Sequence, residues 1–112
     1  MSKQTNKGDK MKKVIGKLVI VRANAAGVHC GKVVEFDPQT QTVMLKDAYR
    51  LWRFQTRDRT GSVSDIAANG LKPDGAHSIG AKLASVTITN PNGLELAEMT
   101  EKAYESVAAW KS

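Results

Sequence analysis

The fold is decided by residues 14–48, which read VIGKLVIVRANAAGVHCGKVVEFDPQTQTVMLKDA. Residues 14–22 form an almost unbroken run of β-branched and aliphatic side chains, which is typical of a strand covered on both faces. Residues 28–36 and 42–48 predict two further strands, because turn residues separate each run from the one before it. The short connections between the three runs predict an antiparallel β-meander.

Alternation along the second run predicts which side chains share a face of the sheet. Gly27 precedes this run and supplies the positive φ value that a tight reversal needs. Val33 breaks the alternation, because it falls on the face expected to be polar. The apolar face is expected to carry Val28, Cys30, Val34 and Phe36, and the opposite face His29, Gly31 and Glu35.

The second half of the chain mixes short strands with two helices. Ser62 begins a sequence that resembles a capping box, and Gly70 is a plausible end for the helix that follows. Residues 82–89 alternate apolar and polar side chains, and residues 94–99 predict one more strand. Thr100 is expected to cap a C-terminal helix. The predicted fold class is α+β, with an antiparallel β-meander or barrel-like sheet, a short central helix and a C-terminal helix.

Length and composition limit the classes of protein that this chain can belong to. It has 112 residues and a formal charge of +6, with 25% charged residues. We expect a flexible Lys-rich tail over residues 1–13 and one ligand-binding domain over residues 14–112. No apolar run is long enough for a membrane-spanning helix, and the N-terminus lacks the apolar stretch of a secretion signal. The single Cys30 excludes an internal disulfide, so we expect a cytoplasmic protein.

The sequence does not contain a complete phosphate-loop or zinc-binding motif. Residues 27–32 read GVHCGK, whereas a phosphate loop has four residues between its glycines and a Ser or Thr after its Lys. His29 and Cys30 are adjacent in a strand and point to opposite faces, and together with His77 they are too few for a zinc site. Cys30 is expected to be a small core residue. We therefore expect no enzyme activity, no cofactor and no metal.

Cationic and aromatic side chains gather near residues 50–57. Guanidinium groups bind phosphate in a bidentate way, and aromatic rings stack on flat bases. Residues 51–54 can continue the third strand, which would place Trp52 and Phe54 on one face. Two alternatives stay open: these two aromatic residues are core residues, and His29 is an ordinary exposed strand histidine. The expected ligand-binding residues are Arg22, Gly27, His29, Arg50, Trp52, Arg53, Phe54 and Arg57.

Five short strings of this sequence carry a resemblance to other proteins: VIVR at 19–22, AGV and Gly at 26–31, LKDA and RLW at 45–52, SVS and IA at 62–67, and TEKA at 100–103. They resemble strings in a family of small phage-encoded proteins, and the similarity covers residues 14–112 in order. This family resembles the Thoeris anti-defence sponges of phages. Its pattern has Trp-Tyr-Trp followed closely by Gly-Ala-Ala-Ser, where this chain has Arg-rich residues 55–61, a departure that bears on ligand choice.

The resemblance implies a protein that sequesters a cyclic ADP-ribose isomer, or another cyclic nucleotide signal, without cleaving it. Such signals are made by bacterial TIR-domain immune enzymes, so the expected location is the host bacterial cytoplasm. The resemblance also implies a homodimer or homohexamer. In this interpretation Arg22 and Arg50, with Arg53 or Arg57, hold a pyrophosphate, and Trp52 or Phe54 stacks on adenine.

RNA binding is the competing interpretation. Residues 31–37 followed by residues 43–50 also resemble the first motif of Sm-like RNA-binding barrels. Asp37 matches that motif, but Gln41 or Thr42 stands where the motif has Asn, and the Arg-Gly of the second motif is absent from the sequence. The Lys-rich tail would add salt-dependent phosphate contacts. A structural or partner-binding phage protein is the third interpretation.

Overall fold

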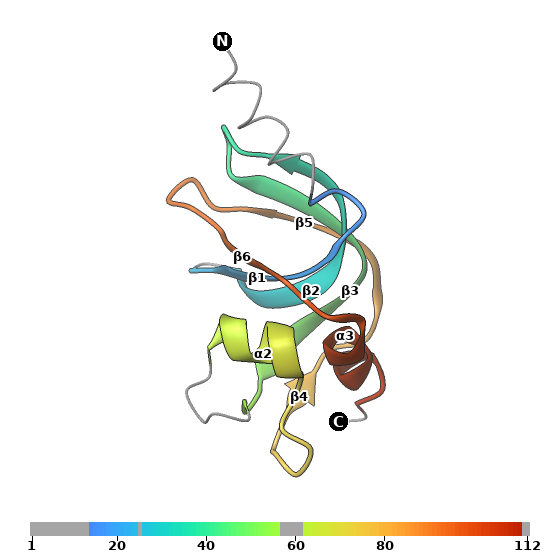
Figure 1. Ribbon diagram of the computed structural model, residues 1–112. Coiled ribbons are helices and arrows are strands. Elements are labelled where there is room, and N and C mark those ends of the chain that lie inside the picture. Colours follow the sequence, from blue (N-terminus) through green and yellow to red (C-terminus); the bar gives the residue numbers. More distant parts are fainter. Residues whose placement is uncertain (1–13, 25, 57–61, 111–112) are drawn as a thin grey trace.

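The computed structural model describes residues 14–24, 26–56 and 62–110 (Figure 1). The fold is α+β, as predicted, with one antiparallel sheet of six strands and two helices among these residues. No helix in the described part of the chain has the length and apolar character required to cross a membrane. The elements are β1 (Leu18–Ala23), β2 (Gly27–Asp37), β3 (Thr42–Arg53), α2 (Val63–Asn69), β4 (Ser78–Ile79), β5 (Leu83–Thr89), β6 (Glu95–Glu98) and α3 (Glu101–Ala108).

The sheet is strongly curved, and its strand order is β4-β3-β2-β1-β6 (Figure 1). β3 carries two partners on one edge, because β5 pairs with its first part and β4 with its last residues. β5 leads into β6 through a tight turn in which the N–H of Gly93 donates to the carbonyl of Asn90 at 2.8 Å. β6 then pairs with β1 at the opposite end of the strand order. The turn thus connects the two ends of the sheet directly.

The first strand is shorter than predicted, and the third is longer. β1 begins at Leu18, because residues 14–17 form a turn closed by a 3.0 Å hydrogen bond from the N–H of Lys17 to the carbonyl of Val14. β3 continues from Thr42 as far as Arg53. The longer β3 is what places Arg50, Trp52 and Arg53 on the sheet.

Two apolar clusters lie on opposite faces of the sheet and define the two faces used below. Alternate residues of a strand share a face, so membership of a cluster assigns each neighbouring side chain to one face as well. The helix-side cluster contains Ile20, Val28, Cys30 and Leu51 of the sheet with Val63, Ile66, Ala67, Ala103 and Val107 of α2 and α3. The β5-side cluster contains Val19, Val21, Ala23, Val33, Val43, Leu45, Ala48 and Ile88.

The alternation of faces predicted for residues 28–36 holds as far as Val33. The pairing of β2 with β3 shifts register between Cys30 and Lys32 and again between Val33 and Glu35. Val33 lies on the face opposite to Val28 and Cys30, in the β5-side cluster, and is 2% exposed, because the face expected to be polar is also covered, whereas Val34 is 37% exposed. The predicted face was wrong for Phe36, because the extra residue of β2 between Val33 and Glu35 moves Phe36 to the β5-side cluster.

Both helices begin at the predicted caps. The Ser62 hydroxyl accepts a hydrogen bond from the N–H of Asp65, and the Thr100 hydroxyl accepts one from Ala103, each at 3.0 Å. α2 ends at Gly70, as predicted. The capped ends fix both helices under the curved sheet, where their apolar sides complete the helix-side cluster.

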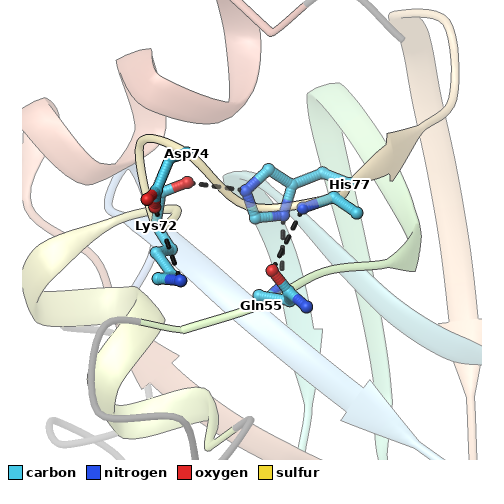
Figure 2. A network of polar contacts seen from close by, with 5 residues as sticks. Gln55, Lys72, Asp74 and His77 are labelled. Atoms are coloured by element: carbon cyan, nitrogen blue, oxygen red, sulfur yellow. Dashed lines mark hydrogen bonds and ion pairs between the residues drawn. The ribbon is translucent and has the colours of Figure 1, made fainter.

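His77 connects the segment between α2 and β4 to the residues that follow β3 through hydrogen bonds (Figure 2). The His77 Nδ1 atom accepts from the N–H of Gln55 at 3.1 Å, and Nε2 donates to the carbonyl of Lys72 at 2.8 Å. The ring of Trp110 packs edge-on against His77 with 4.5 Å between centroids, and it also contacts the helix-side cluster. His77 is therefore a structural residue, and Trp110 anchors the end of α3.

Candidate functional site

The face on which the predicted binding residues lie is set by an irregularity at Asp47 in β3. Asp47 has a φ of 50°, and the buried positions change from Val43 and Leu45 before it to Ala48 after it on the same face. A regular strand would instead bury position 47 there. Because the alternation shifts by one residue, Arg50 lies on the β5-side face.

Gly31 makes this irregularity possible by letting β2 approach β3 closely. A Cβ atom at position 31 would lie 2.9 Å from the carbonyl oxygen of Lys46 and 3.2 Å from the Cα atom of Ala48. Such contacts are too short for any residue with a side chain, so glycine is required at this close approach. The hydroxyl of Tyr104 also donates to the Asp47 carbonyl at 2.6 Å, which fastens the same segment to α3.

Arg50 and Trp52 form the candidate site on this face. Leu51 between them is buried in the helix-side cluster, so both neighbours project to the other side of β3. The guanidinium carbon of Arg50 lies 3.6 Å from the centroid of the Trp52 ring, which is a cation–π contact. Trp52 is 63% exposed, so it is not a core residue. The guanidinium thus lies over one face of an indole ring that remains largely exposed.

Gly27 provides the space that the Arg50 guanidinium occupies. Its φ of 80° confirms the predicted left-handed turn between β1 and β2. A Cβ atom at this position would lie 3.1 Å from Nη2 of Arg50. The backbone of Arg50 is held from the other side, because its carbonyl accepts from the N–H of Gly80 at 2.8 Å. Gly80 was not among the predicted residues, because its proximity depends on the pairing of β3 with β4.

His29 lies directly across from Arg50 in the pairing of β2 with β3. It is 4% exposed, so the interpretation of an exposed strand histidine is wrong. Its Nδ1 atom is buried and has no hydrogen-bond partner. Burial and the nearby positive charge of Arg50 both lower the pKa of His29 below 6.5. The site therefore contains a neutral imidazole beside a permanent cation.

Arg22 does not join this group. It follows Leu18 and Ile20 at alternate positions of β1, on the helix-side face, and it pairs across the strands with Val28 and Glu95. Arg22 and Arg50 therefore project from opposite faces of the sheet. The two arginines were grouped in sequence because each lies near a strand end, and strand ends do not determine a face.

The remaining predicted residues are also divided. Phe54 packs against the helix-side cluster, so it does not share a face with Trp52, as a regular strand would have required. Arg53 is exposed at the end of β3, opposite Ser78 of β4. Arg57 lies outside the described residues. The structure thus brings together Gly27, His29, Arg50 and Trp52 and leaves Arg22 and Phe54 on the other face.

The chemistry of the group is that of binding. The guanidinium fork can donate two parallel hydrogen bonds to a phosphate, and the exposed indole offers a stacking surface. In the described part of the chain, no three His, Cys, Asp or Glu side chains are grouped so that they could hold a metal ion. A cavity of about 420 Å³ lies elsewhere, between α2, α3 and the connector, and contains none of the predicted residues.

Comparison with known proteins identifies a family. A domain of unknown function, DUF6948, matches residues 16–107. No curated protein and no solved structure matches the chain. The matched segment runs from the turn before β1 into α3 and includes every residue of the candidate site. The chain therefore belongs to the DUF6948 family.

Proposed function

We propose that this protein binds a phosphate-bearing cyclic nucleotide at Arg50 and Trp52 and sequesters it without cleaving it. The observation that supports the proposal is the 3.6 Å contact between a guanidinium and an indole that remains 63% exposed. These two groups are suited to the two chemical parts of a nucleotide, its phosphate and its base. The resemblance to anti-defence sponges suggests a cyclic ADP-ribose isomer as the ligand and a phage anti-defence sponge as the role.

Binding follows from the properties of the two side chains. The phosphate oxygens accept charge-assisted hydrogen bonds from the Arg50 guanidinium, which are stronger than bonds between neutral groups. The base stacks on the exposed indole of Trp52, a contact that contributes about 1–3 kcal/mol per base in other proteins. Gly27 leaves the guanidinium room to lie beside the ring. No bond of the ligand is broken in this scheme. Sequestration depends instead on tight binding and slow release of the ligand.

An assembly of identical chains is part of the proposal. The Arg50–Trp52 pair lies on an exposed surface, where a small ligand stays accessible to water on one side. A symmetric dimer, or a hexamer built from such dimers, would cover that side and create equivalent sites at each interface. Covering the ligand would slow its release, which is the property that sequestration requires.

The proposal is tested by ligand depletion and recovery. The full chain is incubated with cyclic ADP-ribose isomers, the free ligand is measured, and the protein is then denatured by heat. We expect loss of ligand from solution followed by recovery of the intact cyclic compound. Recovery of linear ADP-ribose would indicate a hydrolase, and an unchanged free concentration would contradict binding of this ligand class.

Single-stranded RNA is the second candidate ligand. The curved antiparallel sheet and the Arg–Trp pair also suit a backbone phosphate and a stacked base. An RNA site would show affinity that falls steeply with salt concentration, because binding releases counterions. A binding series over increasing salt separates the two interpretations, since a single small ligand releases far fewer counterions than an RNA strand.

A further inference from the structure

We propose that His29 and Arg50 form a proton-linked anion site, in which an anion that binds to the Arg50 guanidinium is accompanied by uptake of one proton on the His29 imidazole. The inference rests on the proposed function, because it requires that the ligand place a phosphate at Arg50. It adds a regulatory property, namely that affinity rises as the pH falls.

The first support is the position of His29 in the sheet. His29 pairs with Arg50 on β3 and with Val21 on β1, and directly opposite residues in an antiparallel pair have side chains in contact range. The imidazole is 4% exposed and Nδ1 has no partner, an unusual state for a buried polar group. Because no hydrogen bond at Nδ1 favours one protonation state of His29, the imidazole can change its protonation state when the nearby charge changes.

The second support is the set of charges around His29. Across the strands, His29 is paired with Val21 on β1, and Val21 is paired with Leu96 on β6. Both of these neighbours project to the same face as His29, and both are apolar. The strand β5, which packs over this face, has no ionisable side chain. Arg22 and Glu95 lie at positions that project to the helix side. Within the described residues, Arg50 is therefore the charged group that acts on His29 directly.

The consequence for binding follows from electrostatics. In the free protein burial and the nearby guanidinium of Arg50 both disfavour a positive charge on His29, so both lower its pKa. A phosphate bound to Arg50 cancels that repulsion and adds an attraction. A proton from solvent then joins the imidazole, so both ring nitrogens become hydrogen-bond donors.

The experiment is calorimetric titration of the full chain with cyclic ADP-ribose at about pH 8 and about pH 5.5, in two buffers that differ in ionisation enthalpy. The bridging pyrophosphate of this probe does not titrate near neutral pH, so proton uptake reports on the protein. We expect net proton uptake of at most one proton per site, smaller at about pH 8 than at about pH 5.5, and a Kd that falls with decreasing pH by at most about tenfold per pH unit. Imidazole resonances of His29 should titrate at higher pH in the complex than in the free protein.

The variant His29→Gln tests the assignment, with Lys46→Ala as the control because Lys46 is an exposed cation on the same strand as Arg50. We expect His29→Gln to bind without proton uptake and Lys46→Ala to keep the uptake. Binding by the unaltered chain without proton uptake, or uptake that persists in His29→Gln, would overturn the inference alone. Absence of binding at both pH values would overturn the proposed function as well, and the two failures are distinct.

Discussion

The guanidinium of Arg50 on β3 lies next to Gly27 on β2, where a Cβ atom at position 27 would lie 3.1 Å from Nη2 of Arg50. The guanidinium occupies the space that a side chain at position 27 would need. Gly27, the first residue of β2, therefore limits where the Arg50 guanidinium can lie. The position of the guanidinium in turn determines how it packs on the Trp52 ring.

The substitution Gly27→Ala tests this contact. A methyl group at position 27 should shift the guanidinium by a few tenths of an ångström on the ring and weaken cyclic ADP-ribose binding by up to about tenfold, equivalent to about 1.4 kcal/mol. The backbone at φ 80° also makes alanine unfavourable, at a cost of about 1–2 kcal/mol in stability. Gly16→Ala is the matched control, because Gly16 has φ 84° and a Cβ atom added there would meet nothing within 4 Å. Equal affinity of the two variants would contradict the role of Gly27.

Trp52 and Trp110 should respond differently to substitution. Trp52→Ala is expected to change the free energy of unfolding by less than about 1 kcal/mol, because the side chain is 63% exposed. The same variant should lose about 1–3 kcal/mol of ligand-binding free energy. Trp110→Ala should instead destabilise the fold by about 3 kcal/mol, since this ring packs on His77 and the helix-side cluster. Urea unfolding and calorimetry measure both quantities, and a Trp52→Ala variant with unchanged affinity would contradict the site.

Gly31→Ala should destabilise the fold through the contact with β3. The added Cβ atom would lie 2.9 Å from the Lys46 carbonyl oxygen, so the strands must separate locally. We expect a loss of about 1–3 kcal/mol in the free energy of unfolding, measured by urea denaturation. Lys32→Ala, at the next residue along β2, is the control and should have little effect. Unchanged stability of Gly31→Ala would show that the irregularity at Asp47 does not need the close approach.

The stability of the protein should depend on pH through His29. Its pKa is lowered below 6.5 in the folded chain, so the unfolded chain binds more protons between the lowered value and 6.5. The free energy of unfolding should therefore be full above that window and decrease as the pH falls through it. Denaturant unfolding of the unaltered chain and of His29→Gln over this range isolates the contribution. An identical pH dependence in both proteins would contradict the assignment.

Much of the fold follows from local patterns in the sequence. The helix caps at Ser62 and Thr100 were predictable because a hydroxyl before a helix satisfies free N–H groups within a few residues. The turn glycine Gly27 was predictable for a similar local reason. These features need no knowledge of distant contacts.

The faces of the sheet were not predictable in the same way. The alternation of side chains depends on irregularities such as Asp47, which arise from the pairing of β2 with β3 across the close approach at Gly31. The sequence therefore indicated the residue types of a binding site and could not separate Arg22 from Arg50. His29 lies beside Val21 of the β5-side cluster and is buried there, which alternation along β2 alone could not indicate.

The most direct measurement for the central claim is the Kd of cyclic ADP-ribose isomers for Arg50→Ala and Lys46→Ala, compared with the unaltered chain. Each variant removes one positive charge from β3. Arg50 contacts the Trp52 ring at 3.6 Å, whereas Lys46 is an exposed residue of the same strand. We expect Arg50→Ala to weaken binding by at least about tenfold with a similar thermal transition, and Lys46→Ala to bind like the unaltered chain. Unchanged affinity in Arg50→Ala would contradict the account.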